Sequence, residues 1–186
     1  MTTIVAVQYY DKVVIGADSL VTSSRKFNHP KMIKISERNN YLIAGAGEVA
    51  ACDIAQHIWE PPTPTVTDRK DLYHFMIATV IPSLKKAFKD NDYKWEKDGD
   101  EETKFAFLIS LEGEVFDISD DFAVCIDEAG FYGVGSGSSL AIGALRTGAS
   151  LEQALKIAAE VDPYTAAPFI FHEQLKKKKV APRTKV

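Results

Sequence analysis

The chain has 186 residues, of which 46% are hydrophobic and 26% charged, a composition typical of one globular domain. Its net charge of −4 argues against a nucleic-acid-binding protein, and no apolar run reaches the roughly 18 residues needed to span a membrane. There is no charged-then-apolar leader, so we expect a cytoplasmic location. Cys52 and Cys125 lie in apolar stretches without metal-ligand spacing, and we interpret them as small buried side chains.

The N-terminal quarter is predicted to form two β-hairpins. Residues 3–8 and 13–17 are mainly β-branched and small apolar residues on either side of a short polar turn. After a polar loop, KMIKI (31–35) and YLIAGAG (41–47) flank the turn SERNN (36–40). Several of these strands have apolar residues on both faces, which is typical of a sheet covered by a second sheet on one side and by helices on the other.

Two helices and three strands are predicted next. Apolar residues recur at helical spacing over 48–59, and the pair Pro61–Pro62 ends that helix. A longer helix is predicted over 70–89. Three short strands follow, in KFAFLIS (104–110), EVFDIS (114–119) and FAVCID (122–127).

The C-terminal part is predicted to hold two short helices, over 140–145 and 151–161, and a last strand over 169–175. Ser150 and Gln153 have the spacing of a capping box at the start of the second helix.

This order of elements predicts an α+β fold, a four-layer αββα sandwich with two helical layers outside two sheets. We expect a single domain over residues 1–175, followed by a basic tail over 176–186.

Thr2 is a candidate nucleophile. A threonine hydroxyl reacts only when a base takes its proton, and a threonine at the start of a chain has its own α-amino group for this purpose. That amine titrates near ~8, so a useful fraction is neutral at neutral pH. Met1 precedes a small residue, the setting in which an initiator methionine is normally removed. A polar residue at the start of a strand is the alternative interpretation of Thr2.

Four motifs decide between these interpretations. The segments MTTIVAV…VVIGADS, KMIKI…YLIAG, GVGSGSSLAIGAL and VDPYTAA occur in one order along nearly the whole chain. Together they resemble the proteasome β-subunits and the bacterial HslV peptidases, which are N-terminal nucleophile hydrolases. The resemblance implies the αββα sandwich of that class and a threonine endopeptidase that hydrolyses peptide bonds with Thr2 once Met1 is removed. It implies no metal or organic cofactor.

By this resemblance, Asp18 and a lysine set the electrostatics of the nucleophile. An ammonium group held by Asp18 beside Thr2 Oγ would lower the pKa of the hydroxyl. Lys31 heads the KMIKI strand and is the predicted lysine, although the loop from Asp18 to Lys31 is about three residues shorter than is usual in the family. Lys34 is the alternative. In an extended strand Lys31 shares a face with Ile33 whereas Lys34 does not, which favours Lys31.

The remaining site residues also follow from the resemblance. Gly45 matches the glycine whose N–H forms the oxyanion hole, with Gly47 as the alternative. Ser136 matches the serine that binds the terminal amine, and Asp162 and Thr165 complete that network. The first substrate pocket is expected to be apolar and without an acid. Its expected residues are Val21, His29, Ile33 and Ile43.

The resemblance further implies a homo-oligomeric ring, a hexamer or heptamer that is stacked on a second ring, an AAA+ unfoldase partner and polypeptide substrates. Neither nucleic acid nor a membrane is an expected partner. Two alternatives from other classes stay open: a catalytically silent structural ring protein, and an amidohydrolase of the same fold that acts on a small molecule.

Overall fold

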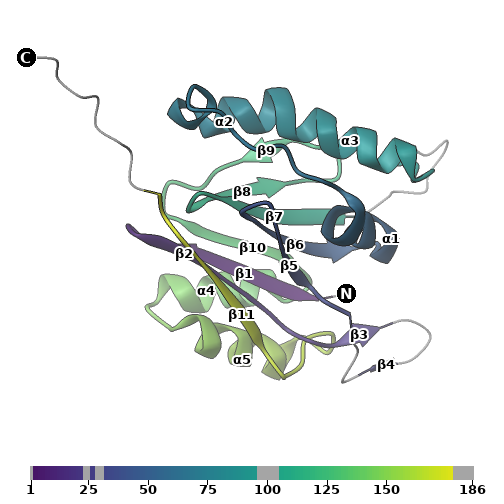
Figure 1. Ribbon diagram of the computed structural model, residues 1–186. Helices are drawn as coiled ribbons and strands as arrows, with labels where there is room; N and C mark the ends of the chain where they lie inside the picture. Colours follow the sequence, from purple (N-terminus) through teal and green to yellow (C-terminus); the bar gives the residue numbers. More distant parts are fainter. Residues whose placement is uncertain (1, 23–25, 28–31, 96–104, 178–186) are drawn as a thin grey trace, which may run out of the picture.

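The computed structural model describes residues 2–22, 26–27, 32–95 and 105–177 (Figure 1). Its strands are β1 (Thr3–Gln8), β2 (Lys12–Ala17), β3 (Val21–Thr22), β4 (Lys26–Phe27), β5 (Ile35–Arg38), β6 (Tyr41–Gly47), β7 (Phe105–Leu111), β8 (Glu114–Ile118), β9 (Val124–Cys125), β10 (Phe131–Gly135) and β11 (Ile170–Leu175). Its helices are α1 (Val49–Asp53), α2 (Leu72–Phe75), α3 (Ile81–Asp90), α4 (Ser138–Arg146) and α5 (Leu151–Val161). Shorter helical turns are η1 (Ile54–Ile58) and η3 (Met76–Val80), both π-helical, and the 3₁₀ turn η2 (Asp68–Lys70).

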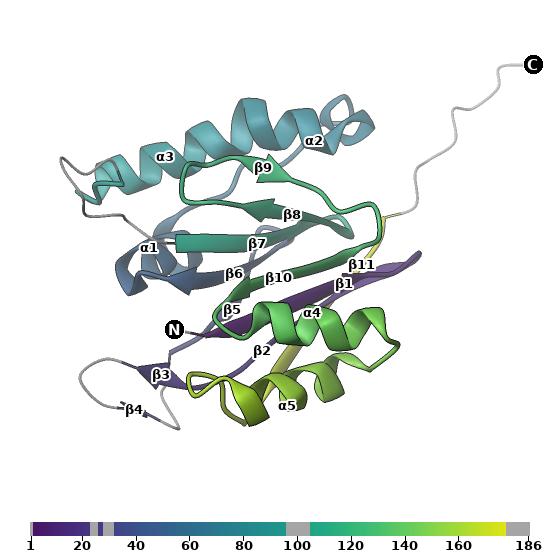
Figure 2. The ribbon, with the colours of Figure 1, turned by 180° about the vertical axis from the view of Figure 1, so that it is seen from behind.

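The strands form two larger sheets and a small ribbon. One sheet has the order β10-β1-β2-β11, the other has the order β5-β6-β7-β8-β9, and β3 pairs with β4. Helices α4 and α5 cover the outer face of the first sheet, whereas α1, α2 and α3 cover the outer face of the second (Figures 1 and 2).

Three apolar cores separate these layers. The core between the sheets contains Ile4 and Ile15 from one sheet and Leu42 and Leu108 from the other. The second core joins the five-stranded sheet to α1–α3, and the third joins β1 to α4 and α5. The layers therefore follow the order helix, sheet, sheet, helix, as the sequence predicts.

The second hairpin differs from its prediction. Strand β5 covers Ile35–Arg38, so it includes residues 36–38, which were expected to lie in the turn. The turn itself is Asn39–Asn40. Both asparagines have positive φ, 48° and 65°, which matches the two-residue turns that connect twisted antiparallel strands. The strand is thus displaced along the chain, and Lys34 lies in a bend before it.

Strand β10 is an element that the sequence analysis missed. It pairs antiparallel with β1, with Thr3 opposite Gly135, and so forms one edge of the first sheet. Its sequence FYGVG contains two glycines, and because glycine is uncommon in strands the segment does not have a typical strand pattern. Gly135 has φ +92°, and a Cβ there would lie 2.0 Å from the Thr2 carbonyl oxygen. Only a glycine lets this strand approach Thr2 so closely.

The cysteine prediction is half right, because Cys52 is buried whereas Cys125 is exposed. The capping box of Ser150 and Gln153 is present at the start of α5. In the ranges that the structure describes, no helix is both long and apolar enough to cross a membrane.

Candidate active site

Thr2 lies one residue before β1 and is 5% exposed. The β1–β2 hairpin pairs Ile4 with Ala17, so Asp18, the next residue of the chain, falls beside Thr3. The Asp18 N–H donates to the Thr3 carbonyl oxygen at 3.1 Å, and the Thr3 N–H donates to Asp18 Oδ1 at 2.9 Å. The register of one hairpin therefore places the Asp18 carboxylate beside Thr2, the candidate nucleophile.

The Asp18 carboxylate is fully buried and has several donors. Its Oδ1 accepts a hydrogen bond of 2.6 Å from Thr2 Oγ1, and its Oδ2 accepts from the N–H groups of Leu20 at 2.9 Å and Ala166 at 3.3 Å. Lys34 Nζ contributes an ion pair of 2.6 Å to Oδ1. A buried carboxylate with this many donors stays in a single orientation.

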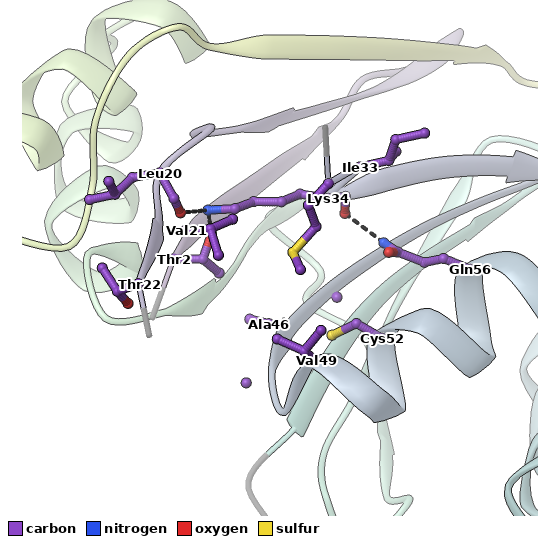
Figure 3. Close-up of a pocket in the computed structure, with 13 residues that line it drawn as sticks. Thr2, Leu20, Val21, Thr22, Ile33, Lys34, Ala46, Val49, Cys52 and Gln56 are labelled. Carbon is purple, nitrogen blue, oxygen red and sulfur yellow. Dashed lines mark hydrogen bonds between the residues drawn. The ribbon is translucent and has the colours of Figure 1, made fainter. Parts of the chain in front are cut away.

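Among the described residues, Lys34 is the lysine that contacts Thr2 and Asp18. Its Nζ donates to Thr2 Oγ1 and to the Leu20 carbonyl oxygen (Figure 3), and also to Asp18 Oδ1. Burial lowers the pKa of Lys34, and the attraction of Asp18 and its hydrogen bond oppose that shift. Lys31 lies outside the described residues.

The displaced strand explains why the sequence argument favoured Lys31 over the lysine that the structure places at Thr2. Strand alternation was applied to residues 31–35, but β5 begins only at Ile35, and Lys34 occupies a bend in which alternation does not hold. Lys34 also removes the apparent shortness of the loop after Asp18, because it lies three residues beyond Lys31.

A second polar network lies on the other side of Thr2. Asp162 Oδ2 accepts hydrogen bonds from Ser136 Oγ at 2.7 Å and from Thr165 Oγ1 at 2.6 Å. Ser136 Oγ also lies 3.4 Å from the Thr2 carbonyl oxygen, and the hydroxyls of Thr165 and Thr3 lie 2.5 Å apart. Burial raises the pKa of Asp162, but these hydrogen bonds lower it by more, so the pKa is lowered and the group stays a carboxylate. Three predicted residues, Ser136, Asp162 and Thr165, thus meet next to Thr2 and Thr3.

Gly45 and Gly47 both line the pocket next to Thr2, but their environments differ. The Gly45 N–H already has an acceptor, the Lys34 carbonyl oxygen, across a long 3.3 Å. Gly47 is exposed, at the end of β6, and has φ +104°. A Cβ on Gly45 would lie 2.8 Å from Cys52 Sγ, so packing alone also requires a glycine there. The assignment of the oxyanion donor to Gly45 stays a prediction, with Gly47 as the alternative.

The pocket has a volume of about 60 Å³ and lies between β6, α1 and the segments on either side of the Thr2–Lys34 contact (Figure 3). Val21 and Ile33, two of the four predicted pocket residues, line it. Ile43 does not, because it is fully buried in the core under α1–α3, and His29 lies outside the described residues. The described lining residues include no acid. They are Thr2, Leu20, Val21, Thr22, Met32, Ile33, Lys34, Gly45, Ala46, Gly47, Val49, Cys52 and Gln56.

Four residues of the site were not found from the sequence: Thr3, Leu20, Cys52 and Gln56. The first two act through backbone groups or a hydroxyl that any strand end offers, and no motif marks them. Cys52 and Gln56 come from the helix that follows β6, and only the packing of that helix on the sheet places them at the pocket. Among the described residues, no group of three or more His, Cys, Asp or Glu side chains is arranged to hold a metal ion.

Comparison with known proteins concerns the sequence of the N-terminal part and the fold. Residues 1–58 match the family described as Proteasome: Proteasome subunit. A search of curated proteins gave no match. Three solved structures share the fold over nearly their whole length.

The first is Thiobacillus denitrificans BPH, with 20% identity, a TM-score of 0.69 and coverage of 94% of this chain and 98% of that chain. The same protein in complex with epoxomicin has 19% identity and a TM-score of 0.71, and the match covers 95% of this chain and 100% of that chain. The eukaryotic HslV from Trypanosoma brucei has 21% identity and a TM-score of 0.61, and the match covers 93% of this chain and 99% of that chain. At these identities the comparison establishes the fold, and this chain has the sandwich of the HslV structure.

Proposed function

We propose that this chain is a threonine endopeptidase subunit whose nucleophile is Thr2. The observation that carries the proposal is the contact of Thr2 Oγ1 with both Lys34 Nζ and Asp18 Oδ1 at the edge of an apolar pocket. The match of residues 1–58 to proteasome subunits and the fold shared with HslV support it. The complex of the Thiobacillus protein with epoxomicin is consistent with a peptide-binding site in this fold.

The proposed reaction begins when the α-amine of Thr2 takes the proton from Thr2 Oγ, and Oγ attacks the carbonyl carbon of a peptide bond. The N–H of Gly45 or Gly47 stabilises the oxyanion of the tetrahedral intermediate. The carbon–nitrogen bond then breaks, the leaving nitrogen receives the proton, and an ester on Thr2 remains. Water hydrolyses that ester, which releases the acid and restores the hydroxyl.

Lys34, held in place by Asp18, favours the ionised form of Thr2 Oγ in this scheme. The ammonium group lies against the oxygen on which negative charge develops, and burial strengthens their interaction. Ser136 and Asp162 orient the α-amine, since Ser136 Oγ lies beside the main chain of Thr2. The amine exists only in a chain that begins at Thr2, so the active form is the one from which Met1 has been removed.

The proposal extends to the assembly. By resemblance to proteasome and HslV subunits, the chain forms a homo-oligomeric ring of six or seven copies, receives polypeptides and works with an AAA+ unfoldase. Analytical ultracentrifugation of the purified protein measures the ring. A monomer at micromolar concentration would contradict this part of the proposal and leave the chemistry at Thr2 to be tested separately.

The chemistry is tested with three preparations: protein that begins at Thr2, protein with an N-terminal extension, and the Thr2→Ala variant. Hydrolysis of fluorogenic peptides and the mass shift after treatment with epoxomicin are measured on each. Of these three, we expect activity and a label on Thr2 in the first alone. A Thr2→Ser variant, added as a fourth protein, should keep residual activity. Equal activity of the extended protein would remove Thr2 from the mechanism. Inactivity of all three would favour the silent structural protein, and hydrolysis of small amides alone would favour the amidohydrolase.

A further inference from the structure

Gln56 is a buried polar residue beside the site for which the reaction scheme has no use. It lies in the π-helical turn η1, where it lines the pocket, and is 2% exposed. Its Nε2 donates to the Lys34 carbonyl oxygen at 2.8 Å (Figure 3) and to the Ile43 carbonyl oxygen at 3.1 Å. Single π-helical turns are rare and occur frequently at functional sites, because they turn a side chain that an α-helix would direct elsewhere.

The Lys34 carbonyl oxygen receives two donors of unequal strength. Gln56 Nε2 is the nearer at 2.8 Å, and the Gly45 N–H lies 3.3 Å away, beyond the usual range for a backbone hydrogen bond. Lys34 itself lies in a bend, and the β5–β6 ladder begins only with the pair Ile35 and Ala44. The main chain of Lys34 is therefore held by a side chain rather than by a ladder.

The two acceptors of Gln56 lie on different elements of the site. Ile43 is on β6, two residues before Gly45, while Lys34 supplies the ammonium group at Thr2 Oγ. One amide group thus fixes the distance between the segment that carries the ammonium group and the strand that carries the predicted oxyanion donor.

We propose that Gln56 is a positioning residue of the peptidase, which holds the main chain of Lys34 so that Nζ reaches Thr2 Oγ and the Gly45 N–H keeps only a weak acceptor. This inference rests on the proposed function. Without the Gln56 amide, the Lys34 carbonyl oxygen has the Gly45 N–H as its remaining donor within hydrogen-bond distance among the described residues, and a shorter bond between them would withdraw that N–H from a substrate.

The test compares Gln56→Met, which keeps the volume and removes both donors, with Gln174→Met as the matched control. Gln174 is a half-buried glutamine on β11 whose Nε2 donates to the Asn40 carbonyl oxygen at 2.7 Å, outside the pocket. Both substitutions remove hydrogen bonds that a side-chain amide donates to main-chain carbonyl groups, and Gln174→Met also removes the acceptor of Ser110 Oγ and of the Gly113 N–H. Both are therefore expected to lower the melting temperature. Only the first is expected to change the chemistry.

For Gln56→Met we expect kcat to fall at least about tenfold and KM to change less than about threefold, the pattern of an interaction made in the transition state. The pH–rate profile should move to higher pH, because an ammonium group held less firmly at Thr2 Oγ stabilises the ionised hydroxyl less. For Gln174→Met, kcat, KM and the profile should equal those of the wild type. If Gln56→Met matches Gln174→Met in all three, Gln56 has a structural role only and the inference is wrong.

Gln56→Glu adds a check that a structural role would not pass. Its carboxylate faces two carbonyl oxygens and donates to neither, whereas its protonated form donates to one. Its activity relative to the wild type should therefore rise as the pH falls. A constant ratio across the pH range would contradict the inference.

A measurement on Lys34 separates this inference from the proposed function. Titration of the Lys34 side chain by NMR should give a lowered pKa in the wild type and a value nearer to the ordinary ~10.4 in Gln56→Met, because the ammonium group leaves its buried position. This result does not require activity. An inactive wild type with this shift would reject the peptidase alone, and an active wild type without it would reject the role of Gln56.

Discussion

Replacement of Lys34 by methionine is the perturbation that tests the site most directly. Methionine fills a similar volume but leaves the Asp18 carboxylate, which is fully buried, without its cation. At 2.6 Å and an effective dielectric constant of about 20, the attraction between the two charges is about 6 kcal/mol before desolvation is subtracted. Loss of one partner of a buried pair typically costs about 3–5 kcal/mol.

This loss has two measurable consequences. The melting temperature of Lys34→Met should fall by about 6–20 °C, because 1 kcal/mol corresponds to about 2–4 °C in a chain of this size. Peptide hydrolysis, measured well below that temperature, should fall at least about 10²-fold, since the charge that stabilises the Thr2 oxygen is gone. Thermal unfolding is followed by circular dichroism and hydrolysis with a fluorogenic peptide, on protein that begins at Thr2.

Lys31→Ala is the informative comparison. The structure puts Lys34 at the position for which the sequence favoured Lys31, so Lys31→Ala should keep most of the activity. An inactive Lys31→Ala together with an active Lys34→Met would refute the geometry of the site. A stable but inactive Lys34→Met would mean that the ion pair contributes to chemistry and little to folding.

Three further predictions concern the pocket, the amine network and the response to acid. Because the described pocket lining is mainly apolar and has no acid, peptides that end in leucine or tyrosine at the cleaved bond should turn over faster than one that ends in arginine, and the reverse order would contradict this. Gly137→Ala should abolish hydrolysis, since its Cβ would lie 2.2 Å from Thr3 Oγ1, whereas Gly143→Ala in α4, with no atom within 4 Å, should keep activity and gain up to about 1 kcal/mol of stability. Burial raises the pKa of Glu112, but Lys177 and Arg69 lower it by more, so its contribution to stability is present above its ordinary pKa and is lost as the pH falls through the lowered value. Urea unfolding of Glu112→Gln should therefore show less loss of stability in acid than the wild type shows.

The sequence by itself determined the layers and most of the residues around Thr2. Hydrophobic patterning fixed the first hairpin, the helices and the order of layers, because burial of an apolar face leaves few arrangements for such elements. Asp18 and Asp162 were predicted from short motifs, and the structure brings both within one hydrogen bond of groups on Thr2 or Ser136. Their catalytic roles remain proposals.

The tertiary structure alone decided which lysine, which pocket residues and which helix side chain belong to the site. The choice between Lys31 and Lys34 depended on where β5 begins, and that was set by the left-handed turn at Asn39–Asn40 and by pairing with β6, neither of which local alternation reveals. Gln56 reaches Lys34 because the helical segment that follows β6 packs on the five-stranded sheet, which contains β5 and β6. Local sequence specifies the conformation of a segment. Contacts between residues distant in the chain depend instead on the register and packing of whole elements, and these are set only when the tertiary core forms.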